Sequence, residues 1–178
     1  MTEPHASRPY MPGYGIDEAG EGAGLLPWSW AEERLLLSHN YWVATVWPDG
    51  RPHAMPVWGI WAAWALWFSS GGDSRKTRNL RADPRCVITT DDAAEPVVIE
   101  GSASIVTDTD SLSVFLELMN EKYKSGMSMD FLDPTVNATF RTRPGCAFAL
   151  NEKEFTSTPT RWDLSGVKHD GGQVPVES

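Results

Sequence analysis

The chain has 178 residues, of which 41% are apolar and 22% charged, and its formal net charge is −9. That length suits one domain with a hydrophobic core, and the acidic balance argues against a general nucleic-acid-binding protein. No stretch approaches the roughly 18 consecutive apolar residues that a membrane span needs, and residues 1–24 have no apolar core of the signal-peptide kind. We therefore expect a cytoplasmic protein with neither a membrane nor a nucleic acid as its partner.

The two ends of the chain differ in composition from the middle. Residues 1–24 are rich in Gly, Pro and acidic residues and show no hydrophobic period, which predicts a mobile N-terminal arm. Residues 164–178 are expected to form a flexible C-terminal tail, which leaves one domain over residues 25–163. Near its start, Ser29 and Glu32 have the spacing of a capping box and predict a short helix.

The middle of the chain alternates short apolar runs with turn residues, a pattern typical of a small antiparallel barrel. We expect a mainly β fold with a few short helices and six strands, over residues 41–46, 52–58, 64–70, 86–90, 97–106 and 146–150. Residues 155–162 are either a seventh short strand or a docking segment. Two further helices are predicted, one from Asp73 or Ser74 to near Pro84 and one over residues 109–124.

Several single residues constrain this arrangement. The turn sequence Pro48-Asp49-Gly50 should join the first two strands into a hairpin. Because Pro56 cannot donate a ladder hydrogen bond, the second strand is expected at a sheet edge or at a bulge. Cys86 and Cys146 each lie in an apolar run and are expected to be small core residues rather than a disulfide. No spacing of His, Cys, Asp or Glu suggests a metal site, and no side chain is singled out as catalytic.

Positive charge is concentrated in one short segment of this acidic chain. Three basic residues precede position 75, and five then fall within eleven positions: Arg75, Lys76, Arg78, Arg81 and Arg85. The segment follows a Ser-Ser-Gly-Gly turn and opens a predicted helix, whose N-terminus would offer unpaired N–H groups and the positive end of the helix dipole. Glycine would let a ligand approach the backbone closely. The segment is therefore a candidate phosphate site, although a basic, solvated helix face would show the same pattern.

A helical wheel at about 100° per residue separates the basic side chains of this segment. Leu80 is the residue expected to point into the domain, and Lys76 and Asn79 flank it. Lys76, in the first turn, is the leading phosphate ligand, and Arg75 comes next at the rim. The other arginines share an outward face.

A linked pattern surrounds the segment. It runs through Ala44-Thr45-Val46, Pro48-Asp49-Gly50-Arg51-Pro52-His53, Pro56-Val57-Trp58, Leu66-Trp67-Phe68-Ser69, Ser74-Arg75-Lys76-Thr77-Arg78-Asn79-Leu80, Asp83-Pro84-Arg85 and Val98-Ile99-Glu100-Gly101. This pattern resembles the pyridoxamine 5'-phosphate oxidase-like split-barrel family over about residues 28–162. It looks closest to the flavin/deazaflavin oxidoreductase subgroup common in actinobacteria.

The resemblance implies a six-stranded split β-barrel, and a homodimer with its cofactor sites at the subunit interface. It assigns cofactor binding to Ser69, Ser70, Ser74, Arg75, Lys76 and Asn79 around the phosphate, and to Pro56, Val57 and Trp58 along the ring. Arg161 and Trp162 resemble a C-terminal element of the subgroup. Together with Trp58 they are the candidate substrate pocket, and packing across the dimer is the alternative role for Arg161 and Trp162.

The implied function is an oxidoreductase that uses the reduced deazaflavin coenzyme F(420) to transfer hydride to a flat, electron-poor small molecule. The outer arginines Arg78 and Arg81 suit the polyglutamate tail of that coenzyme. Two alternatives remain: an FMN-dependent oxidoreductase on the same fold, and a protein that binds a cofactor or haem without turnover. No motif for a pyridoxamine phosphate substrate is present, which argues against oxidase activity on that compound.

Overall fold

The computed structural model of the chain describes residues 3–16 and 24–167. The described residues form nine strands, three α-helices and two short 3-10 helices. The strands are β1 (His5–Ser7), β2 (Tyr41–Val46), β3 (Pro52–Val57), β4 (Ile60–Ala62), β5 (Ala65–Gly71), β6 (Arg85–Thr90), β7 (Val97–Val106), β8 (Asn137–Ala149) and β9 (Thr160–Asp163). The helices are α1 (Trp28–Leu37), α2 (Arg75–Ala82) and α3 (Thr109–Tyr123), and the 3-10 helices are η1 (Met129–Leu132) and η2 (Glu152–Glu154).

All strand pairings are antiparallel, and the strands form one sheet in the order β1-β9-β8-β7-β6-β2-β3. The sheet divides at β8, whose first half pairs with β5 and whose second half pairs with β9. A bulge at Glu100/Gly101 in β7 lies opposite the middle of β8. The sheet therefore curls into a split antiparallel barrel, which confirms the predicted mainly β fold.

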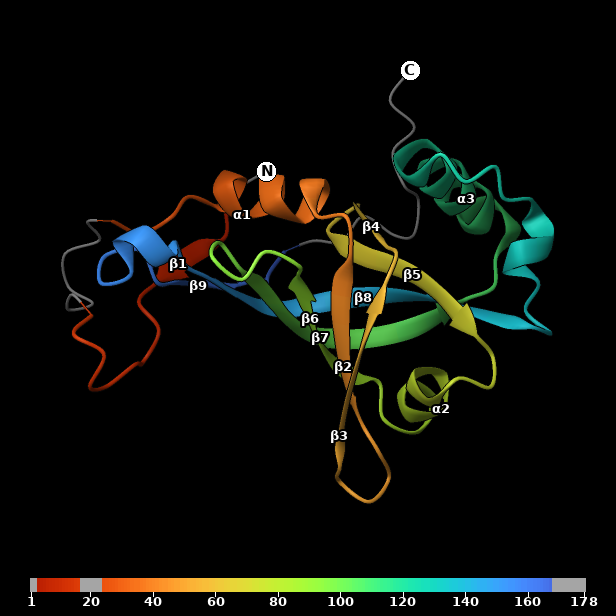
Figure 1. The fold of residues 1–178 in the computed structure, drawn as a ribbon, viewed down its shortest axis with the longest axis horizontal. Helices are drawn as coiled ribbons and strands as arrows, with labels where there is room; N and C mark the ends of the chain where they lie inside the picture. The colour runs from red at the N-terminus through yellow and green to blue at the C-terminus, as the bar shows by residue number, and fades with distance from the viewer. Residues whose placement is uncertain (1–2, 17–23, 168–178) are drawn as a thin grey trace.

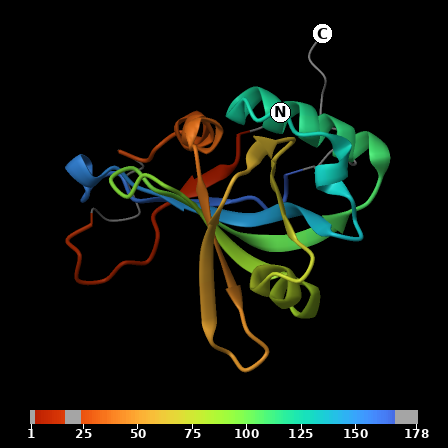
Figure 2. The ribbon, with the colours of Figure 1, turned by 45° about the vertical axis from the view of Figure 1, so that its right-hand side comes forward.

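The helices lie on two sides of this sheet. In Figures 1 and 2, α1 and α3 lie on one side, whereas α2 lies on the other side beside the projecting β2–β3 hairpin. The hairpin is at the end of the strand order, so β3 is an edge strand, as Pro56 predicted. Helix α2 is therefore held next to the exposed edge of the sheet.

Strand β5 separates two hydrophobic clusters. Its side chains alternate, so that Leu66 and Phe68 pack in the main core while Ala65 and Trp67 pack against α3. This two-faced burial explains why all four side chains are buried. The strand begins at Ala65, one residue later than predicted, because Trp64 lies in the preceding turn.

Three parts of the expected arrangement are corrected by the structure. The N-terminal arm contains a strand, because His5–Ser7 pairs with β9; residues 17–23 of the arm lie outside the described residues. Strand β8 begins at Asn137, nine residues before the predicted start at Cys146, because its first half pairs with both β5 and β7. Strand β4 was not predicted, since three residues are too few to show a period.

The helix starts show a further correction. Helix α1 begins at Trp28 with Pro27 as N-cap and no side-chain cap, so the predicted capping role of Ser29 is wrong. Helix α2 is capped by Ser74, whose side chain accepts a hydrogen bond from the Thr77 N–H, as predicted. No helix in the described ranges is both long and apolar enough to cross a membrane.

Candidate functional site

A cluster of hydroxyl groups and one ammonium group lies where β5 meets α2. The Lys76 Nζ donates to Ser70 Oγ at 3.1 Å, and Ser70 Oγ lies 2.9 Å from Ser74 Oγ. Ser74 Oγ in turn lies 3.0 Å from Thr77 Oγ1. We call Ser70, Ser74, Lys76 and Thr77 the phosphate cluster. The first turn of α2 adds the positive end of the helix dipole to it.

Lys76 and Arg75, the two cations at this position, have no carboxylate partner among the described residues. No Asp or Glu lies within ion-pair distance of Lys76 or Arg75 in the part of the chain that the structure describes. Lys76 is half-buried, and burial lowers the pKa of its ammonium group. A half-buried cation held by a neutral hydroxyl is costly unless an anion compensates it. The residues present therefore fit a bound phosphate ester.

Arg75 packs against a tryptophan of the β2–β3 turn. Its guanidinium lies over the Trp47 ring with Cζ 3.5 Å from the ring centroid, and the Arg51 guanidinium lies over the same ring at 4.3 Å. Such a cation–π contact restricts the arginine to the rim of the phosphate cluster. Trp47 was not singled out from the sequence, because nothing in a turn sequence indicates which side chain will contact a helix far along the chain.

The outer arginines of α2 and the following loop are exposed. Arg78 lies 3.7 Å from Asp73, Arg81 donates to the Gly72 carbonyl, and Arg85 forms an ion pair with Asp83. These contacts are solvent-screened and weak. The predicted division between Lys76 and the outward arginines is thus confirmed.

Two of the predicted phosphate ligands lie elsewhere. Asn79 is fully buried, and its Nδ2 donates to Thr45 Oγ1 at 3.0 Å, while its Oδ1 has no hydrogen-bond partner among the described residues. Asn79 therefore fastens α2 to β2 and does not reach a ligand at the surface. Ser69 points to the opposite face of β5 from Ser70, where Thr139 Oγ1 donates to it at 3.4 Å.

The packing of the backbone explains why residue 72 is a glycine. The Gly72 N–H donates to the Val136 carbonyl at 2.7 Å, and a Cβ at this position would lie 3.0 Å from that oxygen. Gly72 thus permits the approach of the chain leading into β8 rather than the approach of a ligand.

The three residues assigned to the cofactor ring face different surroundings. The Val57 side chain is buried in the main core. Pro56 is exposed beside Trp42 on the outer face of the sheet. Trp58 is 44% exposed and stacks on Tyr123 of α3, with ring centroids 4.5 Å apart and planes 9° apart. Of the three, Trp58 presents an aromatic surface to solvent.

The two C-terminal candidates do not meet Trp58 within the described chain. Trp162 is fully buried in the main core, where it packs edge-on against Trp28 at 5.6 Å between centroids. Arg161 is exposed on the outer face of β9. The structure thus places Trp162 in a packing role and Arg161 on the sheet surface.

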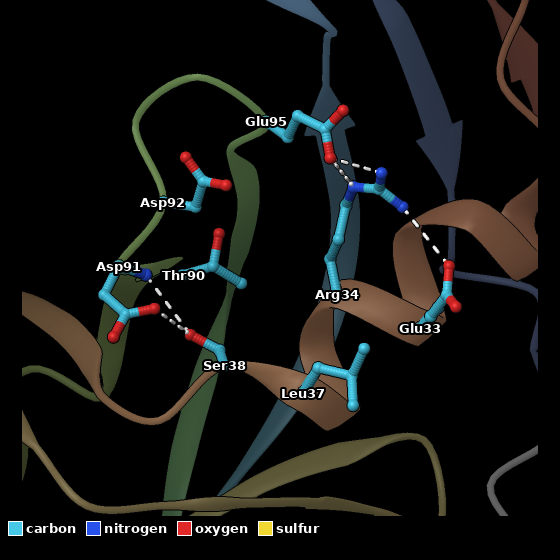
Figure 3. Close-up of a pocket in the computed structure, with 8 residues that line it drawn as sticks. All are labelled: Glu33, Arg34, Leu37, Ser38, Thr90, Asp91, Asp92 and Glu95. Atoms are coloured by element: carbon cyan, nitrogen blue, oxygen red, sulfur yellow. Dashed lines mark hydrogen bonds and ion pairs between the residues drawn. The ribbon is translucent and has the colours of Figure 1, made fainter.

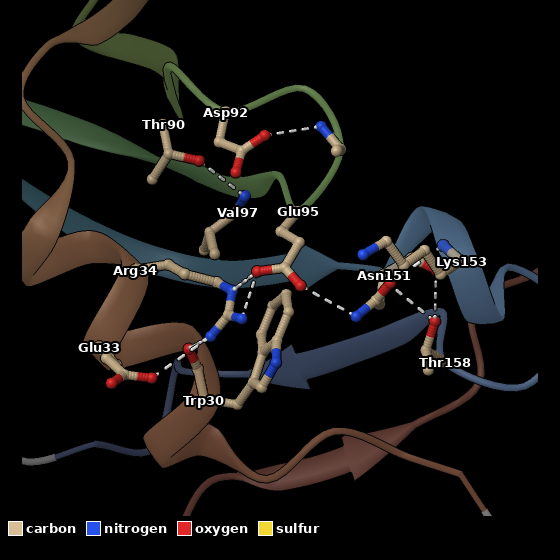
Figure 4. A network of polar contacts seen from close by, with 11 residues as sticks. Trp30, Glu33, Arg34, Thr90, Asp92, Glu95, Val97, Asn151, Lys153 and Thr158 are labelled. Carbon is tan, nitrogen blue, oxygen red and sulfur yellow. Dashed lines mark hydrogen bonds and ion pairs between the residues drawn. The ribbon is translucent and has the colours of Figure 1, made fainter.

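A pocket of about 410 Å³ lies apart from the phosphate cluster, between the end of α1 and the β6–β7 loop (Figure 3). Its lining carries four carboxylates and one arginine: Glu33, Asp91, Asp92, Glu95 and Arg34. Figure 4 shows that Arg34 and Glu95 bind each other and that Asn151 donates to Glu95. This negative lining would repel a phosphate, and the described residues contain no group of three or more His, Cys, Asp and Glu that could hold a metal.

The curled antiparallel sheet, divided at β8 and with α2 beside its edge, defines the class of split-barrel proteins. The chain belongs to the pyridoxamine 5'-phosphate oxidase family, whose model matches residues 31–141. No curated protein matches the chain in sequence.

Solved structures show the same fold at low sequence identity. An F420 reductase has 24% identity and a TM-score of 0.53, over 65% of this chain and 94% of its own. A putative pyridoxamine 5'-phosphate oxidase from Listeria innocua has 20% identity and a TM-score of 0.54, over 70% and 94% of the two chains. A heme-binding protein from Mycobacterium smegmatis has 16% identity and a TM-score of 0.57, over 75% and 62%.

Proposed function

We propose that the chain binds a phosphate-bearing cofactor of the flavin type, the deazaflavin coenzyme F(420), and that it is a reductase of flat, electron-poor small molecules. The observation that carries this proposal is the pair of cations, Lys76 and Arg75, that have no carboxylate partner among the described residues. Lys76, Ser70 and Ser74 would hold the phosphate, and Arg75 would close over it from Trp47. The proposal is supported by family membership and by the F420 reductase among the structural relatives.

The distance along the edge strand suits such a cofactor. Asn79 ties α2 to Thr45, which lies opposite His53 in β3. From His53 to Trp58 the strand advances by about 16 Å, at roughly 3.3 Å per residue. A phosphate at α2 and a flat ring beside Trp58 would therefore lie at the two ends of one extended ligand.

When bound, a reduced deazaflavin supplies the hydride, and the protein supplies binding, orientation and exclusion of water. Trp58 would orient the ring through its exposed indole face, and Lys76 would fix the far end. No described side chain is required as an acid or base for these roles. The outer arginines Arg78 and Arg81, exposed beside the cluster, would attract the polyglutamate tail.

We further propose a homodimer that forms through the outer face of the sheet. Directly paired residues place one continuous row of side chains on that face: Pro56, Trp42, Thr89, Val98, Phe148, Arg161 and Ser7. Trp42 is 46% exposed, and Val46, four residues further along the same face of β2, is 43% exposed. An exposed apolar face of this kind is a typical contact surface between subunits.

The dimer would also give Arg161 a role. In one subunit, Pro56 and Arg161 are separated by five strand-to-strand steps, about 24 Å along the sheet. In a symmetric dimer through this face, the Arg161 end of the row in one subunit would lie toward the Pro56 end of the row in the other subunit. Arg161 would then reach the ring end of the partner's site, which one chain alone cannot achieve.

The test is a fluorescence titration of the purified protein with coenzyme F(420) and, separately, with FMN. Lys76→Met should weaken binding of the preferred cofactor by about 10- to 100-fold, the loss expected for a hydrogen bond to a charged group. The matched control, Lys153→Met, removes an exposed lysine in η2 and should bind like the wild type. Unchanged affinity in Lys76→Met would show that the phosphate lies elsewhere.

The same titration separates the alternatives. Arg78→Met should weaken F(420) more than FMN, because FMN has no polyglutamate tail. Tight binding of FMN alone would identify the FMN-dependent oxidoreductase. Tight binding of a cofactor or of haem, with no reduction of any acceptor in a panel of enones, quinones and tetrapyrroles, would identify a binding protein without turnover.

A further inference from the structure

Three polar contacts converge on Gly59, the residue that follows Trp58. The Gly59 N–H donates to the Tyr123 hydroxyl at 2.8 Å, and the Gly59 carbonyl accepts from Lys122 Nζ at 3.1 Å and lies 3.0 Å from the Tyr123 hydroxyl. Gly59 also has no room for a side chain, since a Cβ would lie 3.0 Å from the Trp67 carbonyl. The backbone beside Trp58 is therefore fixed by the last turn of α3.

The Tyr123 hydroxyl has a single proton and two carbonyl acceptors within reach. It accepts from the Gly59 N–H, and it lies 3.0 Å from the Gly59 carbonyl and 2.8 Å from the His39 carbonyl. Because Lys122 already donates to the Gly59 carbonyl, donation from Tyr123 to the shorter contact, the His39 carbonyl, is favoured. Lys122 thus biases the direction of the Tyr123 hydrogen bond.

The loop that carries His39 is anchored from its other side. Ser38 Oγ donates to Asp91 Oδ1 at 2.7 Å, and the Asn40 N–H donates to Asp91 Oδ2 at 3.1 Å (Figure 3 shows the Ser38 contact). The His39 ring lies 5.2 Å from the Tyr123 ring and 6.5 Å from the Trp58 ring, in both cases near edge-on. His39, Trp58 and Tyr123 form one aromatic surface, which we call the aromatic wall.

Lys122 carries a charge at a half-buried position, where a packing residue is usually apolar. It is half-buried, donates to the Tyr41 hydroxyl at 2.9 Å, and forms no ion pair in the described part of the chain. Tyr41 is itself buried and its hydroxyl donates to the Leu35 carbonyl. An apolar residue would fill the same space without the cost of desolvating a charge, so the ammonium group is explained by the hydrogen bonds that it directs.

We propose that Lys122 and Tyr123 are positioning residues that fix the plane of Trp58 and so set the ring end of the cofactor site. This inference rests on the proposed function, because the ligand of the aromatic wall is the ring of that cofactor. Tyr123 acts by stacking on Trp58 and by bonding Gly59, and Lys122 acts by directing the Tyr123 proton to His39. The wall joins the ends of α1, β3 and α3, three segments far apart in sequence.

The first measurement needs no ligand. The protein is labelled with fluorinated tryptophan, and the Trp58 resonance is assigned with Trp58→Phe. In Lys122→Met and in Tyr123→Phe the Trp58 resonance should shift, while the other eight of the nine tryptophans stay in place and report an intact fold. The matched control, Lys124→Met, removes an exposed lysine two residues further on and should leave Trp58 unchanged.

The second measurement is the cofactor titration in the same variants. Lys122→Met and Tyr123→Phe should weaken binding of F(420) by about two- to tenfold, in the range of an aromatic pair, whereas Lys124→Met should not. An unchanged Trp58 resonance in both variants would overturn the inference. A shifted resonance with unchanged affinity for F(420) would overturn it too. Failure of the wild type to bind any cofactor instead refutes the proposed function, while the fluorine spectra still decide whether α3 orients Trp58.

Discussion

The guanidinium of Arg75 lies over the indole of Trp47, with Cζ 3.5 Å from the ring centroid. The two residues come from the first turn of α2 and from the end of β2, so the contact joins the helix to the hairpin. In the proposed complex this contact would hold a cation beside the phosphate before the ligand binds, which would lower the entropy lost on binding. Trp47 would then be a positioning residue that the sequence pattern did not reveal.

Trp47→Ala should weaken binding of the phosphate-bearing cofactor by about three- to tenfold, because a partly exposed cation–π contact contributes about 0.5–1 kcal/mol and more when desolvated. The measurement is the fluorescence titration with F(420) and FMN. Arg51→Ala, which removes the other guanidinium from the same ring, serves as the control and should bind normally. Equal losses in both variants would indicate a general disturbance of the hairpin.

Trp42→Glu should convert a dimer into a monomer, because it places a charge in the apolar centre of the proposed subunit contact. Light scattering coupled to size-exclusion chromatography measures the mass directly. Leu37→Glu, which changes another exposed apolar residue at the end of α1, should leave the mass unchanged. A monomeric wild type would rule out the proposed contact face.

Lys122 should make the stability of the protein depend on pH. Burial lowers the pKa of its ammonium group from 10.5 to about 8 in the folded state, with Asp91 opposing the shift. Between about pH 8 and 10.5 the unfolded chain binds more protons at this residue, so its contribution to the free energy of unfolding rises with pH.

The measurement compares urea unfolding of the wild type and Lys122→Met at pH 7 and pH 9.5. The stability of the wild type relative to the variant should be greater at the higher pH. The facing groups Tyr41, Tyr123 and Asp91 are present in both proteins, and burial raises the pKa of both tyrosines, so they stay protonated over this interval. A constant difference would show that Lys122 is not desolvated.

Ala63→Asn should stabilise the protein by about 1 kcal/mol. Ala63 and Trp64 form the two-residue turn between β4 and β5, with φ angles of 49° and 56°. Alanine pays a steric cost in this left-handed conformation that asparagine largely avoids. Urea unfolding gives the change, with Ala93→Asn in an exposed loop as a neutral control, and a loss of stability in Ala63→Asn would contradict the left-handed turn.

Local pattern was enough to find most of the barrel. β2 and β7 have the predicted limits, and the turn at residues 48–50 joins β2 and β3 as expected. The first half of β8 was missed because it carries Arg141 and Arg143 on one face and so lacks a clear apolar period. Its pairing depends on strands about 70 and 40 residues away in the chain, β5 and β7, which no local window contains.

In the candidate site, too, the features set by local sequence were predicted and those set by distant contacts were not. The wheel separated Lys76 from the exposed arginines, because the buried side of α2 is set by its own sequence. It did not distinguish Asn79, which is buried against Thr45, from a ligand at the surface. The resemblance assigned both Ser69 and Ser70 to the phosphate, although adjacent residues of a strand point to opposite faces.

By itself, the sequence determined the barrel class, a helix cap at Asp73 or Ser74 and the position of a basic helix after β5, because these depend on local propensity, period and charge. The tertiary structure decided which of those charges lack a counter-charge, that Trp47 holds Arg75, and that Lys122 and Tyr123 meet Trp58. These relationships join segments that are distant along the chain, and only the packing of the sheet and its helices brings their atoms within contact distance.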